Sequence, residues 1–118
     1  MILHKDIEVK KIKMDMEGAE DVFKRVLIGV DDGSSNIFMR LFTIKSGGHT
    51  PRHTHPFPHI VKWMSGKGVI TDGKGKENEV EVGMSAFIEG GEEHQFRNPF
   101  DEDCSFLCVI PNPEKLGK

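Results

Sequence analysis

The sequence contains no tyrosine, a single tryptophan and only two cysteines among 118 residues. Cys104 and Cys108 lie four residues apart in a segment that we predict to be one strand, which would separate their Cα atoms by about 13 Å. A disulfide bond requires Cα atoms within about 7 Å of each other, so this spacing excludes a disulfide between them. We expect two reduced thiols.

A long apolar run is also missing. No stretch approaches the roughly 20 apolar residues that a membrane-spanning helix needs. The first residues, from Met1 to Asp6, lack the basic-then-apolar order of a signal peptide. We therefore expect a soluble cytoplasmic protein that does not bind membranes.

Concentrated positive charge is the third absence. The formal net charge is -3, and the 16 lysines and arginines are scattered along the chain. Without a basic stripe, nucleic acid is not an expected partner. The length suits one hydrophobic core but not two, so we predict a single domain over residues 1–118.

What the sequence does contain is a series of short apolar segments separated by turn signals. No window keeps a helical period, and turn-forming residues recur about every eight to twelve positions. This pattern predicts an all-β fold, either a sandwich or a closed barrel. Residues 1–22 are weakly patterned and are expected to form an edge strand and a loop. The other predicted strands are residues 23–30, 36–44, 60–64, 69–71, 79–82, 84–88, 95–98 and 105–110.

Segment 37–44 is the most apolar of these strands. Apolar residues occupy both of its faces, which predicts burial on both sides, in a sandwich or beneath a partner subunit. Arg40 interrupts it. A buried arginine is either paired with a carboxylate, which we favour, or directed at an anionic ligand.

Histidines cluster in one short stretch, at His53, His55 and His59. The side chains of His53 and His55 would leave the same face of an extended strand, with Cα atoms about 6.6 Å apart, so that both could reach one metal ion. Pro56 and Pro58 predict a turn that returns His59 as a third ligand. The alternative is that each ring simply makes ordinary hydrogen bonds.

Two stretches carry glycines and histidines at fixed spacings, the first from Gly47 to Gly66 around His53 and His55 and the second from Gly83 to Asn98 around His94. Together they resemble the cupin superfamily. The first has glycine, histidine and glycine at the cupin spacings, and the second repeats the family's order of glycine, histidine and asparagine. Glu89 stands where the family usually has proline, and His59 stands where it usually has a glutamate ligand. The resemblance spans residues 47–98 and implies a double-stranded β-helix, or jelly-roll barrel, in one domain. The matching residues are Gly47, His53, His55, Gly66, Gly83, Gly91, His94 and Asn98.

The resemblance also implies a metal site formed by His53, His55, His59 and His94, as in cupins with four histidine ligands. Imidazole ligands favour a transition metal over calcium or magnesium. What is known of such cupins favours Mn(II) first and Fe(II) second, with Zn, Ni, Co or Cu also acceptable in purified protein. We expect Cys108 to line the pocket or to be a small core residue, and Arg40 and Cys108 are the candidate catalytic residues.

Three functions agree with such a site. The first is a metal-dependent oxygenase of the dioxygenase type acting on a small organic substrate, with Phe38, Phe42, Trp63 and Phe87 available for an apolar pocket, although Trp63 is favoured as core filling. The second is an isomerase or lyase acting on a small hydroxy- or keto-compound. The third is a non-catalytic module that binds a metal or a small molecule. Small cupins generally dimerise, so a homodimer with N-terminal strands packed on the partner is expected.

Overall fold

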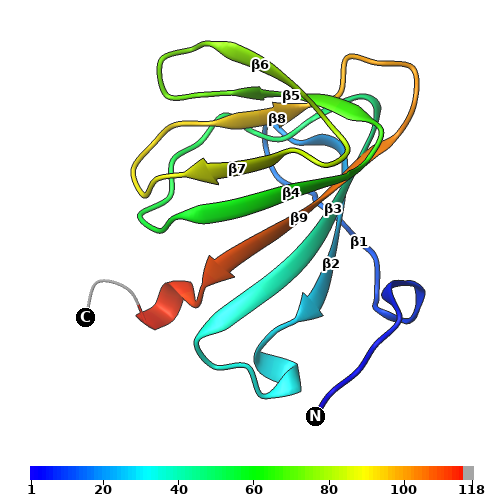
Figure 1. Cartoon of the computed structure of the whole chain (residues 1–118), viewed down its shortest axis with the longest axis vertical. Coiled ribbons are helices and arrows are strands. Elements are labelled where there is room, and N and C mark those ends of the chain that lie inside the picture. Colours follow the sequence, from blue (N-terminus) through cyan, green and yellow to red (C-terminus); the bar gives the residue numbers. More distant parts are fainter. Residues whose placement is uncertain (116–118) are drawn as a thin grey trace.

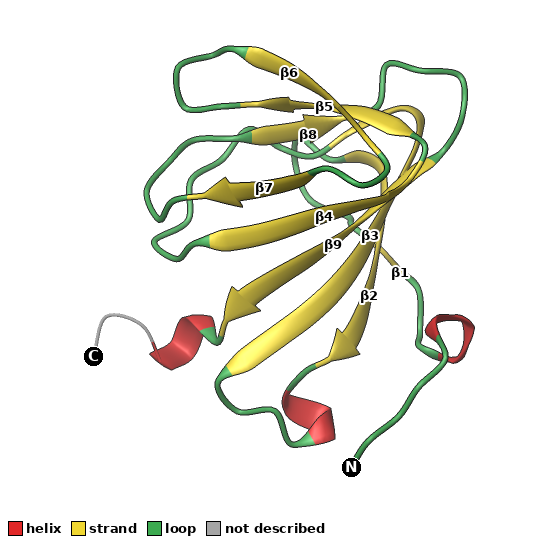
Figure 2. Ribbon diagram, in the orientation of Figure 1, coloured by secondary structure: helices red, strands yellow, loops and turns green. Residues whose placement is uncertain are grey.

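The computed structural model describes residues 1–115, which form β-strands and three short 3-10 helices (Figures 1 and 2). The all-β prediction is confirmed. The helical turns lie at Asp6–Glu8, Val30–Asp32 and Pro113–Lys115. The strands are β1 (Ile12–Lys13), β2 (Glu20–Ile28), β3 (Ile37–His49), β4 (His59–Ser65), β5 (Lys67–Thr71), β6 (Glu77–Glu81), β7 (Ser85–Ile88), β8 (Gln95–Arg97) and β9 (Cys104–Pro111).

The strands pair antiparallel in one curled sheet. The main path runs β6-β5-β8-β3-β9-β4-β7, and β2 joins the edge of β3 and carries β1. Figure 1 shows the curl, with β5, β6 and β8 across the upper part and β9, β3 and β2 running below them. The sheet therefore encloses an interior, as expected for the predicted jelly-roll barrel.

β3 connects the two parts of the sheet. Its first eight residues pair with β9, and its last residue, His49, pairs with Arg97 of β8. The change of partner occurs at two glycines. Gly47 has a φ of 83°, and a Cβ on Gly48 would lie 2.6 Å from the carbonyl oxygen of Glu20. Only glycine allows the strand to bend this closely against its neighbour.

A stack of aromatic rings fills the interior. Phe106 lies between Trp63 and Phe96, with centroid distances of 4.8 and 4.5 Å, and Phe42 stacks on it at 5.3 Å. Burying each such side chain stabilises the fold by roughly 1.5–3 kcal/mol. Trp63 is fully buried, so its expected role in filling the core is confirmed.

The prediction that segment 37–44 is buried on both faces is wrong within a single chain. Phe42 and Ile44 point inward and are buried, whereas Ile37 is 57% exposed. Met39 and Leu41, on the same outward parity, are half-buried. The curl of the sheet covers its inner face only, because no second sheet in the described residues packs outside β3.

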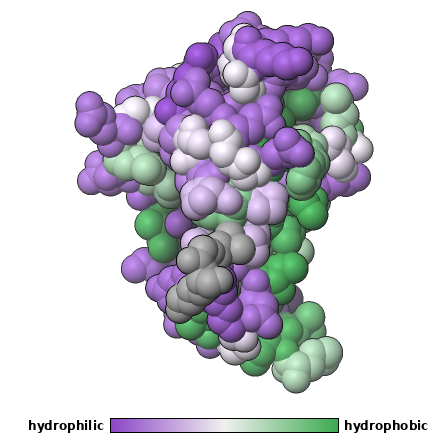
Figure 3. All heavy atoms as spheres, turned by 90° about the vertical axis from the view of Figure 1, so that its left-hand side faces the viewer, coloured by the Kyte–Doolittle hydropathy of each residue, from purple (hydrophilic) through white to green (hydrophobic). Residues whose placement is uncertain are grey.

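Both cysteines are free, as predicted from their spacing, and both are buried. No helix within residues 1–115 is long and apolar enough to cross a membrane. The face shown in Figure 3 is mostly hydrophilic, with hydrophobic residues gathered toward its right and lower edges.

Candidate metal centre

The segment between β3 and β4 carries two of the predicted ligands, and it is held against β8. The backbone N–H of Thr50 donates to the carbonyl of Phe96 at 2.8 Å. His53 and His94 form an antiparallel β-bridge, in which the backbone N–H of each donates to the carbonyl of the other, with N···O distances of 3.1 and 3.0 Å. Further along, Gly91 donates its N–H to the carbonyl of His55. His53 and His55 therefore lie in a loop rather than on a regular strand, yet backbone hydrogen bonds hold both.

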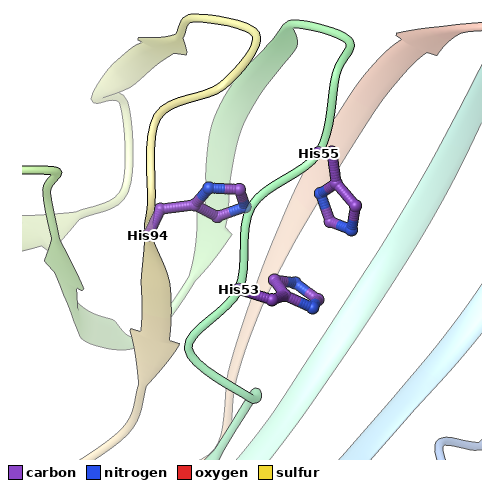
Figure 4. A group of neighbouring side chains, drawn as sticks. All are labelled: His53, His55 and His94. Carbon is purple, nitrogen blue, oxygen red and sulfur yellow. The ribbon is translucent and has the colours of Figure 1, made fainter.

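The rings of His53, His55 and His94 converge on one point (Figure 4). Each of these residues offers one ring nitrogen within 4.8 Å of those of the other two. The Nδ1 atom of His94 lies 2.8 Å from the carbonyl oxygen of Glu92. When Nδ1 donates that hydrogen bond, Nε2 keeps its lone pair for a ligand, as in most metal-binding histidines. The three histidines could therefore hold a metal ion.

His59, the first residue of β4, lies beside this group. It is not one of the three residues whose ring nitrogens all lie within 4.8 Å of one another. Its ring centroid is 5.0 Å from that of His55 and 4.9 Å from that of His94. The residue is only 4% exposed, and all four histidines line the same cavity. The structure thus groups three predicted ligands closely and adds the fourth as an adjacent ring, so the four-histidine set stays a prediction.

Burial and mutual proximity favour the neutral form of His53, His55 and His59. Burial, followed by the nearby charges of His53, His94 and Arg40, lowers the pKa of His55 to about 4. Burial is also the main cause that lowers the pKa of His59 to about 3. The pKa of His53 is lowered as well, by burial and then by His94. Since only neutral imidazole binds a metal ion, these shifts favour coordination at neutral pH.

Unpaired nitrogens provide a test of whether a metal fits. The Nδ1 atoms of His55 and His59 are buried and have no hydrogen-bond partner within residues 1–115. Buried polar atoms without partners are rare in native proteins and call for a missing ligand or ion. A cluster of neutral imidazoles with such atoms fits a transition-metal ion. No carboxylate within the described part of the chain lines the cavity, which disfavours calcium or magnesium.

Arg40 and Cys108 meet across paired strands and also line the cavity. They are directly opposite each other in the register of β3 and β9, and Nη2 of Arg40 donates to the Sγ atom of Cys108 at 3.0 Å. The favoured expectation that Arg40 pairs with a carboxylate is wrong, since no acidic side chain within residues 1–115 forms an ion pair with it. Burial raises the pKa of Cys108, which Arg40 only partly offsets, so this side chain stays a thiol at neutral pH.

The apolar walls of the cavity differ from those expected. Phe42 is part of them, but Phe87 is 63% exposed on the outer face of β7, and Trp63 lies in the core. Sequence reasoning missed Met14 and Met16, because the N-terminal segment that precedes β2 carries no motif. The cavity, of about 140 Å³, is lined by Met14, Met16, Ala19, Val22, Phe42, Thr50, Pro51, Phe96 and Phe106, besides the polar residues named above.

The remaining histidines do not join the site. His4 pairs with Asp32 at 2.6 Å and does not line the cavity. His49 is half-buried and does not line the cavity. The side chain of Glu92 accepts a hydrogen bond from the N–H of Gly73. Its carbonyl oxygen, rather than its carboxylate, contacts the histidine group.

A family comparison agrees with this fold and site. The family model described as the cupin domain matches residues 40–110, which is more than half of the chain. The chain belongs to the cupin family. The match runs from Arg40 to Ile110, so it contains all four histidines and most of the curled sheet. The resemblance inferred from the glycine and histidine spacings is thereby confirmed for the fold and the family.

Individual cupins give more detailed likenesses. A curated relative, the 1-methylthio-D-xylulose 5-phosphate methylsulfurylase of Rhodospirillum rubrum, is 32% identical over 72 residues, covering 61% of this chain and 46% of the relative. The chain therefore spans about half the length of that curated relative. Among solved structures, the polyketide cyclase RemF from Streptomyces resistomycificus has a TM-score of 0.89 and 29% identity, covering 94% of this chain and 79% of that one. A cupin-2 domain protein from Rhodospirillum rubrum has a TM-score of 0.80 and 27% identity, covering 93% and 74%.

Proposed function

We propose that this cupin is a metal-dependent enzyme in which His53, His55, His59 and His94 hold one transition-metal ion beside a small-molecule cavity. The observation that carries this proposal is the convergence of four histidines on one cavity, three of them with ring nitrogens within 4.8 Å of one another. His59 is included because its ring is buried against two of the others and its Nδ1 atom has no partner. Mn(II) is the first choice of ion and Fe(II) the second.

The reaction class that we favour is a dioxygenase-type oxidation of a small organic substrate. A bound Mn or Fe ion would supply Lewis acidity and redox chemistry toward dioxygen. The chain would supply the rest. Loop backbone held on β8 fixes the rings, and Phe42, Phe96 and Phe106 offer an apolar wall that excludes water from the substrate. The described lining residues include no carboxylate that could act as a general base, which disfavours chemistry driven by proton abstraction.

A second candidate is a Lewis-acid reaction without net oxidation, such as an isomerisation, a cyclisation or a lyase reaction. The names of two similar proteins, a methylsulfurylase and a polyketide cyclase, favour it. Four neutral ligands would leave the ion its full positive charge, which strengthens its pull on a substrate oxygen.

Metal content tests the ligand set directly. We expect about one ion per chain in natively purified protein, and a sharp loss in His53→Ala, His55→Ala, His59→Ala and His94→Ala. His49→Ala is the matched control, because its ring does not line the cavity, and it should keep the ion. A His59→Ala protein with the wild-type metal content and an unchanged Mn electron paramagnetic resonance spectrum would reduce the ligand set to three.

Oxygen uptake then separates the two reaction classes. The metal-loaded protein is given catechol, diketone and alkene substrates in an oxygen electrode, and the same substrates under nitrogen. Uptake that depends on the ion supports the oxygenase. Conversion that proceeds equally well without oxygen supports the Lewis-acid reaction.

A further inference from the structure

Arg40 is fixed on the inner face of the sheet. It lies near the start of β3, where paired neighbours on β2 and β9 hold the backbone on both sides. Its guanidinium carbon lies 4.9 Å from the centroid of the Phe42 ring, and Nη2 contacts the thiol of Cys108. A planar group held by an aromatic face and a cross-strand contact is well oriented toward whatever occupies the cavity.

The charge of Arg40 has no partner in the described part of the protein. Its Nε atom is buried and unpaired, and the sulfur that Nη2 contacts is a weak acceptor. Among residues 1–115, no aspartate or glutamate lines the cavity. Lys24, on the neighbouring strand, adds a second positive charge, and its pKa is lowered by burial and then by Arg40. A half-buried cation beside another cation is unfavourable unless an anion compensates it.

We infer that Arg40 binds the carboxylate of a small organic anion whose apolar part lies against Phe42, Phe96 and Phe106. This inference rests on the proposed function, because it names the substrate class of the same cavity. Guanidinium groups match planar carboxylates with paired hydrogen bonds. A cavity of about 140 Å³ is close to the roughly 150 Å³ that holds one benzene molecule, so the substrate is a compact monocarboxylate rather than a large phosphate ester.

Benzoate and benzamide are matched probes of this inference, because they share a ring and differ in charge. Their dissociation constants are measured by saturation-transfer NMR on zinc-loaded and on metal-free protein. We expect the wild type to prefer benzoate by about tenfold to a hundredfold, the range for a hydrogen bond to a charged group. Arg40→Met should reduce this preference to nearly one, and Arg40→Lys should give an intermediate value.

Arg97→Met is the control, since Arg97 is paired with Glu77 on the surface and does not line the cavity. It should keep the full preference for benzoate. Thermal melts show whether each variant is folded, and Arg40→Gln replaces Arg40→Met if the latter does not fold. Phenyl phosphate is measured alongside, and Arg40-dependent binding tighter than that of benzoate would overturn the assignment of a carboxylate.

The two protein forms separate this inference from the proposed function. A benzoate preference that persists in Arg40→Met but disappears when zinc is removed would identify the ion as the anion site and overturn the role of Arg40. A wild-type protein that fails to take up zinc, yet prefers benzoate in an Arg40-dependent way, would support the role of Arg40 while contradicting the metal site. Absence of any benzoate preference in the folded wild type, in both forms, would overturn the inference.

Discussion

Replacing His59 by glutamine should make the stability of the metal-free protein less sensitive to acid. Burial, together with the charges of His94, His55, Arg40 and His53, lowers the pKa of His59 to about 3 from 6.5. Below pH 6.5 the unfolded chain takes up a proton at this position while the native chain does not. The associated stability is therefore fully present above the unfolded pKa and is lost as pH falls toward the native pKa.

The magnitude follows from the two pKa values. At pH 7 the ring is mostly neutral in both states, whereas at pH 5 the proton bound by the unfolded chain lowers the free energy of unfolding by about 2 kcal/mol. This free-energy change needs little correction for solvent screening, because His59 is only 4% exposed. His55 adds a loss of the same sign, reduced by its partial exposure.

The assay is urea unfolding at pH 7 and pH 5 in the presence of a chelator, for the wild type and His59→Gln. Between pH 7 and pH 5, the free energy of unfolding of the wild type should fall by about 2 kcal/mol more than that of the variant. His49→Gln, outside the cavity, is the control and should behave as the wild type. Equal losses in wild type and His59→Gln would refute the reasoning. With saturating metal, the added stability should be large at pH 8 and shrink as the pH falls toward about 4, the lowered pKa of His55, because protons then compete with the ion for the rings.

Two further predictions concern the scaffold and its assembly. Asn98→Ala should lower the free energy of unfolding by about 2–4 kcal/mol in urea titrations. The reason is that the buried Asn98 amide donates to the carbonyls of Ile44 and Glu102 and accepts from the N–H of Phe100. A loss below about 1 kcal/mol, the size of one ordinary hydrogen bond, would contradict this role. We also expect a homodimer in solution. Ile37, Ile60 and Phe87 are 57%, 58% and 63% exposed around one shallow hollow, so Phe87→Asp should shift the homodimer toward monomers. A 13.3 kDa particle for the wild type, in light scattering at micromolar concentration, would disprove the dimer.

The sequence by itself determined the class of fold and predicted where the candidate site lies. Strands alternate between inward and outward side chains, so the apolar segments and the turns between them predicted most strand positions, such as the hairpin of β5 and β6. The spacings around Gly47, His53, His55 and His94 were sufficient to identify the cupin family, because those glycines and histidines occupy fixed places in one local structure.

Only the tertiary structure decided which side chains share the cavity. Arg40 and Cys108 are 68 residues apart and meet because β3 and β9 pair in one register; no local pattern encodes such a contact, and it replaced the carboxylate partner expected for Arg40. Met14 lines the cavity because the N-terminal segment runs along β2. Phe87 does not line it, because its side chain points outward from β7. Local spacing fixes the direction of a side chain along its strand, whereas pairing between distant strands and the curl of the sheet fix what that side chain meets.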